Sequence, residues 1–286
     1  MKITALKADL KLQKSKFPKK PSGFVPTMGA LHEGHLSLVH EAVLKCPIVI
    51  VSIFVNPTQF NDKNDLRNYP RNIEKDLKLL SPMMRENDIV FTPEVSEIYP
   101  EEDKRQFHFG NLDNVMEALH RPGHFNGVAQ VVSRLFEITE PDVAFFGIKD
   151  FQQVAVIKDL VRQTNSKVKI ISCPIVREKD GLAMSSRNML LDPAIRKNAP
   201  VIFKTLTSAS EMFTDHDVSD IKGFVFDRIN SIRGFDVEYF EIADDTELYT
   251  INSKKEMIPD RKYYGCIAVK AGSVRLIDNV QMPGQD

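Results

Sequence analysis

Short apolar runs alternate with amphipathic stretches over residues 24–172, and this alternation constrains the fold more than any other feature of the sequence. In the helix predicted from Pro70, the proline suits the first turn, and Ile73, Leu77 and Leu80 share one face. The chain is therefore expected to form an α/β fold around a largely parallel sheet that helices cover on both faces. The predicted strands are one ending at Val25 and those at 48–55, 88–93, 142–146 and 167–172, and the predicted helices are 36–46, 70–80, 126–139 and 151–162.

The pattern changes after Pro174. A loop rich in glycine and serine comes first, followed by helical patterns at 193–213 and 221–232 and by alternating strands that continue to Ile277. This arrangement is typical of a smaller α+β domain. We therefore expect two domains, one of residues 1–175 and one of residues 176–286.

The amino-acid composition argues against nucleic-acid and membrane partners. The chain of 286 residues is 42% apolar and 27% charged, which is ordinary for a soluble globular protein. With 38 basic against 39 acidic residues it lacks the positive excess of a nucleic-acid-binding protein. The longest apolar stretch, residues 48–55, is too short to cross a bilayer. We expect neither a nucleic-acid partner nor a membrane partner.

The lysine-rich start, residues 1–20, has no apolar core or cleavage site of a secretory signal, and we expect a solvated basic segment there. The three cysteines, Cys46, Cys173 and Cys266, are too widely spaced to suggest a zinc site or a disulfide framework. Reduced thiols in the cytoplasm are the interpretation that fits both observations.

The strongest local motif is PTMGALHEGH, residues 26–35, where the first strand gives way to the first helix. A helix N-terminus at the carboxyl edge of a parallel sheet favours phosphate. His32 and His35 are three residues apart, so both imidazoles can point the same way, and Gly34 lets a flat ring approach the backbone. Alternative interpretations are a metal site, for which no third ligand is evident nearby, and histidines that merely cap the helix or face solvent.

Two further motifs carry phosphate-binding residue types. In REKDGLAMSSRN, residues 177–188, a glycine, paired hydroxyls and an arginine are donors that can surround a polyphosphate, although such a segment can also be an ordinary polar linker. In FGIKDFQQ, residues 146–153, Lys149 follows another strand end. A lysine in that position is more often solvated than catalytic.

Taken together, these motifs and their order resemble the pantothenate synthetase family, within the broader H-x-G-H nucleotidyl transferases. The resemblance covers essentially the whole chain and is strongest from Phe24 to Asn188. It implies a Rossmann-like domain, residues 1–175, that binds ATP and pantoate, and a C-terminal lid, residues 176–286, in a homodimer. The segments that carry it are PTMGALHEGH, SIFVNPTQF, YPR, RPGHFNGV, FGIKDFQQ, REKDGLAMSSRN and, near the end, IAVK and Arg275-Leu-Ile-Asp-Asn279.

The resemblance also assigns roles to residues. Gln59 and Gln153 would hydrogen-bond pantoate, helped by Asn56, while Met28, Phe54, Val131 and Val132 would surround its methyl groups. His32, His35, Lys149, Ser185, Ser186 and Arg187 would be catalytic. The residues expected to bind ATP are Met28, Gly29, Ala30, Leu31, His32, Glu33, Gly34, His35, Gly147, Ile148, Lys149, Asp150, Val176, Met184, Ser185, Ser186 and Arg187.

The implied reaction condenses pantoate with β-alanine through a pantoyl adenylate, with Mg²⁺ bound mainly by the ATP phosphates. Two departures from the family pattern are visible. Ile148 stands where the family often has a charged residue, and the acidic helix after YPR is only partly kept, so that Asp76 is the candidate for a metal contact. The alternatives are another H-x-G-H nucleotidyl transferase and a catalytically silent nucleotide-binding or RNA-associated protein.

Overall fold

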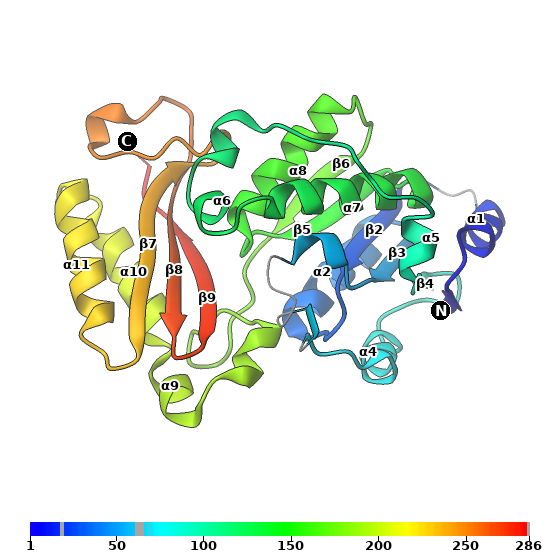
Figure 1. The fold of residues 1–286 in the computed structure, drawn as a ribbon, viewed down its shortest axis with the longest axis horizontal. Helices are drawn as coiled ribbons and strands as arrows, with labels where there is room; N and C mark the ends of the chain where they lie inside the picture. Colours follow the sequence, from blue (N-terminus) through cyan, green and yellow to red (C-terminus); the bar gives the residue numbers. More distant parts are fainter. Residues whose placement is uncertain (18–19, 61–65, 68, 285–286) are drawn as a thin grey trace.

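A computed structural model describes residues 1–17, 20–60, 66–67 and 69–284, and it contains two sheets (Figure 1). The first has six strands, all parallel, in the order β1-β4-β3-β2-β5-β6, and the second has three antiparallel strands in the order β7-β8-β9. This confirms the predicted α/β fold with a smaller α+β part. The strands are β1 Lys2–Thr4, β2 Ser22–Thr27, β3 Ile48–Ile53, β4 Ile89–Phe91, β5 Val143–Gly147, β6 Lys169–Cys173, β7 Phe235–Asp244, β8 Tyr263–Ala271 and β9 Val274–Gln281.

Helices follow most strands of the large sheet, as the alternation of the sequence predicts. None of the described helices is long and apolar enough to cross a membrane. The helices are α1 Lys7–Ser15, α2 Glu33–Lys45, α4 Ile73–Leu80, α5 Val95–Ile98, α6 Glu117–His120, α7 His124–Thr139, α8 Phe151–Gln163, α9 Pro193–Asn198, α10 Val201–Met212 and α11 Val218–Asn230.

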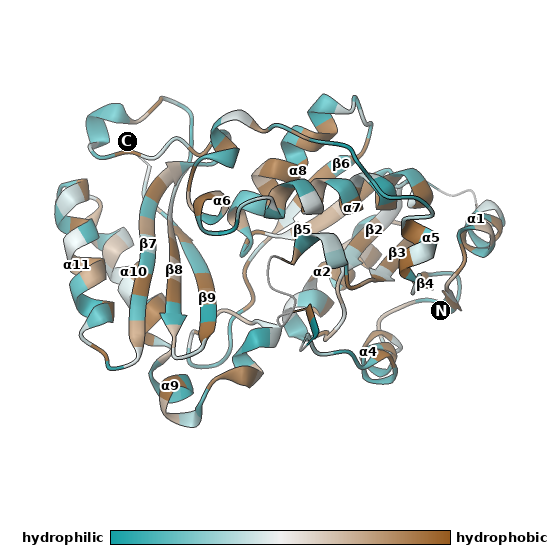
Figure 2. Cartoon of the chain, viewed as in Figure 1, coloured by the Kyte–Doolittle hydropathy of each residue, from teal (hydrophilic) through white to brown (hydrophobic). Residues whose placement is uncertain are grey.

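The large sheet is buried on both faces. Alternate residues of a strand point to opposite faces, so Phe24 and Ile50 pack in one core with α7 and α8, while Val25 and Val51 pack in another with α2 and α4. All four side chains are fully buried. In Figure 2, α1 is mostly hydrophilic, whereas α4 and α11 show both hydrophilic and hydrophobic colours, and all three helices lie at the outside of the molecule.

The strand order creates a crevice. From β2 the chain proceeds outward through β3 to β4 on one side, whereas β5 and β6 lie on the other side of β2. In open α/β sheets, ligands bind beyond the carboxyl ends of the strands at such a reversal. The β2–β5 pairing in the described residues comprises Gly23 with Val143 and Phe24 with Ala144, although β2 extends to Thr27. The two strands therefore part toward their carboxyl ends.

The segment predicted to be solvated and basic, residues 1–20, is mostly exposed or half-buried where the structure describes it, but it also forms a strand and a helix that the prediction did not include. Lys2 to Thr4 pair in parallel with β4 at the edge of the large sheet, and α1 buries Leu10 at 1% exposure. Residues 18 and 19 of this segment lie outside the described residues. The apolar periodicity of α1 is hard to recognise among its lysines, because only one face of a short helix at a sheet edge has to be apolar.

Two predicted helices also need correction. The helix expected from Pro70 starts at Ile73, because the Asn72 side chain accepts a hydrogen bond from the Lys75 N–H and caps it. Ile73 is 42% exposed, so the inward face is that of Asp76 and Leu80.

The helix expected over 193–213 is two helices, α9 and α10. Pro200 separates them, because proline has no N–H to continue the first helix.

The second sheet packs against α10 and α11 and forms a core of its own. Ala243 and Cys266 of this sheet, and Leu248 between β7 and β8, belong instead to the core of the larger sheet. The two parts of the chain are therefore joined by apolar packing as well as by the connection after β6. A domain boundary at residue 175 stays a prediction.

Candidate active site

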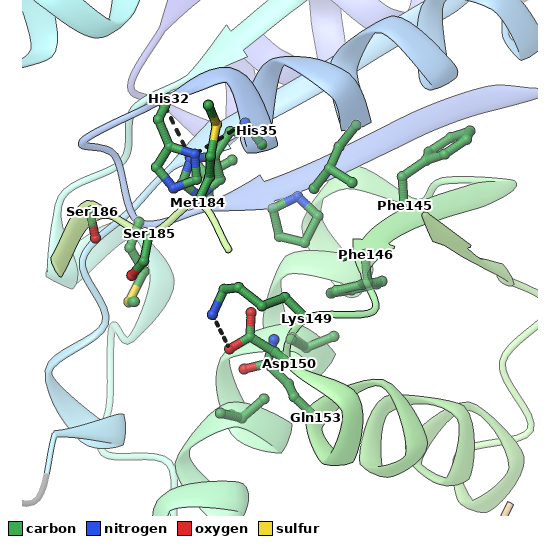
Figure 3. A pocket seen from close by; sticks show the side chains of 18 of the residues that line it. His32, His35, Phe145, Phe146, Lys149, Asp150, Gln153, Met184, Ser185 and Ser186 are labelled. Atoms are coloured by element: carbon green, nitrogen blue, oxygen red, sulfur yellow. Dashed lines mark hydrogen bonds and ion pairs between the residues drawn. The ribbon is translucent and has the colours of Figure 1, made fainter. Parts of the chain in front are cut away.

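The crevice beyond β2 and β5 contains a cavity that residues 174–176 and 184–187 border. Most of the residues predicted to form a site line it together. Figure 3 shows His32 and His35 on one side of the cavity and Lys149 with Asp150 across from them. The predicted residues in its wall are Met28, His32, Gly34, His35, Phe54, Asn56, Gln59, Val131, Val132, Gly147, Lys149, Asp150, Gln153, Val176, Met184, Ser185, Ser186 and Arg187.

The loop between β2 and α2 has an unusual backbone that one carboxylate holds. Gly29 and Ala30 have φ values of 79° and 50°, in the left-handed region that a residue such as Ala30 rarely adopts. The Asp76 carboxylate accepts hydrogen bonds from the backbone N–H groups of Ala30 at 3.0 Å and Leu31 at 2.8 Å. Asp76 is 2% exposed, and burial raises its pKa. This buried contact from α4 stabilises the loop in its strained form.

His32 and His35 form a reciprocal cap on α2. His32 Nδ1 accepts a hydrogen bond from the Gly34 N–H at 3.1 Å, and His35 Nδ1 accepts one from the His32 N–H at 3.4 Å. The ring centroids are 4.1 Å apart. The capping interpretation of the sequence is thus correct. It does not exclude a chemical role, since the cap uses only Nδ1 of each ring and Nε2 takes no part in it.

Both histidines are neutral at physiological pH. Burial, followed by the nearby charge of Lys149, lowers the pKa of His32 to about 4. Burial, followed by the neighbouring His32 and Lys149, lowers the pKa of His35 to about 3. Because Nδ1 is the acceptor in both rings, the neutral tautomer carries its proton on Nε2. The pair therefore offers two neutral N–H donors.

The turn after β5 carries Lys149 into the cavity. Its side chain is 20% exposed, and Nζ lies 3.5 Å from Asp150 Oδ1. Ile148, the departure from the family pattern, donates its N–H to Cys173 O of β6 at 2.9 Å, and its side chain packs against the core of the large sheet. An apolar residue at this position thus contributes to packing and does not line the cavity.

The predicted loop after Pro174 is an ordered hairpin. Met184 N–H donates to Val176 O at 3.0 Å, and Arg177 forms an isolated bridge with Ala183. Ser185 Oγ accepts from the Arg187 N–H at 3.2 Å and caps a short 3₁₀ turn, Ser186–Leu190. The hairpin therefore brings the hydroxyls and the arginine of the motif to the cavity on a defined support.

The two glutamines lie in the wall of the cavity on different elements. Gln59 ends a 3₁₀ turn, Pro57–Gln59, and its Nε2 contacts Met28 Sδ at 2.6 Å, whereas Gln153 lies in the first turn of α8. Asn56 Nδ2 donates to Gln59 Oε1 at 3.3 Å and to Gly127 O at 3.2 Å. Asn56 is 1% exposed, so its amide group holds Gln59 in place. Phe54, Val131 and Val132 supply buried apolar surface nearby.

Six of the predicted residues do not line this cavity: Gly29, Ala30, Leu31, Glu33, Asp76 and Ile148. Glu33 is exposed at the first turn of α2. Within the described residues, no group of three or more His, Cys, Asp or Glu side chains is arranged to hold a metal ion. Gly29, Ala30 and Leu31 form the loop between β2 and α2, and the Asp76 carboxylate holds this loop by two hydrogen bonds.

Sequence reasoning missed several wall residues. Val128 and Leu135 lie one helical turn from Val131 and Val132 on α7, so helical spacing could have found them. Tyr69 belongs to the YPR segment on which the resemblance rests. The other missed residues are Leu38 in α2 and, near the strand ends and the hairpin, Pro26, Thr27, Phe145, Phe146, Pro174 and Ile175.

A parallel sheet with this strand reversal, and with a histidine pair, a lysine and hydroxyl donors at the reversal, defines an α/β nucleotide-binding protein. The comparisons identify the family. The sequence profile described as pantoate-beta-alanine ligase matches residues 1–281. The chain therefore belongs to the pantoate–β-alanine ligase family, also called the pantothenate synthetases.

Individual relatives agree over nearly the whole chain. The pantothenate synthetase of Azobacteroides pseudotrichonymphae is 52% identical over 97% of this chain and 98% of its own length. A crystal structure of the Thermus thermophilus pantothenate synthetase has a TM-score of 0.90 at 37% identity and covers 99% of this chain and 100% of its own. The ligase of Francisella tularensis, solved with an ATP ligand and β-alanine, has a TM-score of 0.80 at 35% identity, covering 98% of this chain and 97% of its own.

Proposed function

We propose that this protein joins pantoate to β-alanine at the expense of ATP, releasing AMP and pyrophosphate through a pantoyl adenylate. The observation that carries the proposal is a cavity in which a phosphate-type donor set meets two amide side chains. His32, His35, Lys149 and the hairpin residues 184–187 suit a polyphosphate, while Gln59 and Gln153 suit a hydroxy acid because amides both donate and accept.

In the first step, a carboxylate oxygen of pantoate attacks the α-phosphorus of ATP, and the bond from that phosphorus to the bridging oxygen of pyrophosphate breaks. The attacking oxygen is already anionic, so no general base is required. The work of the protein is to align the reactants and to stabilise charge on the phosphates. The Nε2–H groups of His32 and His35, the Lys149 ammonium and the groups of Ser185, Ser186 and Arg187 provide donors for this purpose.

In the second step, the amine of β-alanine attacks the acyl carbon, and AMP leaves with the oxygen that came from pantoate. A second, smaller hollow adjoins the cavity and shares Lys149, Asp150 and Gln153 with it. Arg121 and His124 line this hollow. We assign it to β-alanine, because a guanidinium can bind the carboxylate of β-alanine while its amine points toward the adenylate.

The remaining proposals concern Mg²⁺, assembly and location. Asp76 uses both carboxylate oxygens to hold the loop, so Mg²⁺ would bind chiefly to the phosphates of ATP, where it would screen the leaving pyrophosphate. A homodimer is expected from the family resemblance, and a cytoplasmic location is expected from the three widely spaced, unpaired cysteines. The C-terminal part, residues 176–286, would act as a lid that keeps water from the reactive anhydride.

Isotope exchange between labelled pyrophosphate and ATP tests the proposal. With pantoate present and β-alanine omitted, we expect exchange, and we expect pantothenate and AMP only after β-alanine is added. Pantothenate formation without exchange would contradict the adenylate. Loss of both activities in the folded protein would contradict the assigned reaction and favour another nucleotidyl transfer.

A further inference from the structure

β9 presents different residues to the two parts of the molecule. Val274 and Leu276 face the core of the second sheet. Arg275 and Asn279 lie on the opposite face of the strand, toward the larger sheet, and Arg275 donates two hydrogen bonds of 2.7 Å to the Glu117 carboxylate. Figure 1 shows β9 as the strand of the second sheet nearest the larger domain. The RLIDN segment is therefore a contact between the two parts of the chain.

Within this segment, Asn279 contacts the turn that carries Lys149. Its Nδ2 donates to Ile148 O at 2.9 Å and to Lys149 O at 3.1 Å. Asn279 is 3% exposed, so replacing its amide would leave two carbonyl oxygens without this donor in a place that water reaches poorly. The turn after β5 is thus held by β6, through the Ile148 N–H, and by β9.

This contact bears directly on Lys149. Orienting the carbonyls of residues 148 and 149 orients the peptide planes on both sides of the Lys149 Cα, and therefore the direction in which its side chain leaves the backbone. We propose that Asn279 is a positioning residue: it orients Lys149 for adenylation and makes that orientation depend on where the C-terminal part of the chain sits. The proposal rests on the adenylation proposed above.

The structure contains a matched control. Asn111 Nδ2 also donates to two consecutive carbonyl oxygens across the two parts of the chain, those of Glu247 at 2.9 Å and Leu248 at 3.2 Å. Asn111 does not line the cavity. Asn111→Ala therefore removes the same kind of contact between the two parts without touching the turn that carries Lys149.

The test is a double-mutant cycle on pantoate-dependent pyrophosphate–ATP exchange, with the wild-type rate measured first. Asn279→Ala and the isosteric Asn279→Asp, which has no donor, should lower kcat by about 10- to 100-fold, the size expected when a catalytic group is misplaced. The KM for pantoate should change little, and Asn111→Ala should retain wild-type kcat. In a Lys149→Ala background, the Asn279 substitutions should cost less than about threefold, because the group they orient is gone.

Exchange by the wild-type protein tests the proposed adenylation, and the Asn279 variants test the positioning role. A failure of one proposal can therefore be told apart from a failure of the other. Near-normal kcat in folded Asn279 variants would overturn the positioning role. So would an equal loss with and without Lys149, or an equal loss in Asn111→Ala, because each would indicate a general structural effect. If Asn279→Ala does not fold, the double-mutant cycle with Lys149→Ala is measured with Asn279→Asp instead.

Discussion

The ends of β2 and β5 both deliver cationic or polar groups to one cavity, but they are held differently. The loop after β2 is fixed within the larger sheet's own domain, by the Asp76 carboxylate on α4. The turn after β5 is fixed partly by Asn279 on β9 of the second sheet. The histidine pair is therefore preset by local contacts, whereas the orientation of Lys149 is open to influence from the C-terminal part.

The largest expected effect comes from removing the groups themselves. His35→Ala and Lys149→Ala should each lower turnover by about two to three orders of magnitude, the usual loss when one donor that stabilises developing charge is removed. Pyrophosphate–ATP exchange measures this, with His40→Ala, an exposed position on the same helix, as the control. Near-normal turnover in both variants would contradict the roles given to the two strand ends, and a lowered melting temperature with intact turnover would indicate a structural role.

An intermediate effect is expected from the support of the β2 loop. Asp76→Asn replaces one carboxylate oxygen by an amide donor, which cannot accept from the loop, so the strained backbone should relax and kcat/KM for ATP should fall by roughly 10- to 30-fold. Glu74→Gln, on the exposed side of α4, is the matched control.

The same variant sharpens the comparison of the two strand ends. Because Asp76 and Asn279 act on different ends, the losses of Asp76→Asn and Asn279→Ala should multiply in the double variant. A loss in Asp76→Asn that raised Mg²⁺ concentrations restore would contradict the loop-holding role and support a metal contact at Asp76.

The smallest effect concerns pH. An unfolded chain protonates histidine with a pKa near 6.5, whereas burial lowers the pKa of His32 to about 4 and of His35 to about 3. Between these values the unfolded state binds more protons, so the free energy of unfolding should fall as the pH drops from 6.5 toward 4. Each such histidine contributes a slope of at most about 1.4 kcal/mol per pH unit.

Denaturant unfolding of His35→Gln should show a shallower slope than wild type, whereas His216→Gln, at an exposed position, should not. An unchanged slope for His35→Gln would mean that this imidazole is not held neutral in the folded protein.

The sequence predicted the parts of this fold that depend on strong periodicity. The buried runs at β2, β3 and β5 and the helices α7 and α8 were found within a few residues, because each is apolar enough to be recognised alone. β1 and α1 were missed, since a short edge strand and a lysine-rich helix bury little apolar surface. The break at Pro200 was missed although its physical reason, the absent N–H, was visible in the sequence.

The residues of the site could be predicted from its motifs, but the hydrogen bonds that hold them in place could not. The residue types at 26–35, 146–153 and 177–188 pointed to phosphate, and the structure brings those segments to one cavity. The side chains that hold the loop after β2 and the turn after β5 could not be identified from one sequence. Nothing in the spacing of Asp76 or Asn279 indicates that their side chains reach backbone groups 45 and 130 residues away.

The most direct test of the central claim, attack by pantoate on the α-phosphorus at this cavity, follows an oxygen atom. The reaction is run in the purified protein with pantoate labelled by ¹⁸O in both carboxylate oxygens, together with ATP and β-alanine. We expect one labelled oxygen in the phosphate of each AMP released, because the acyl–oxygen bond breaks when the amine attacks. Label in pyrophosphate or inorganic phosphate, or AMP without label, would contradict the adenylate and the roles assigned to the two strand ends.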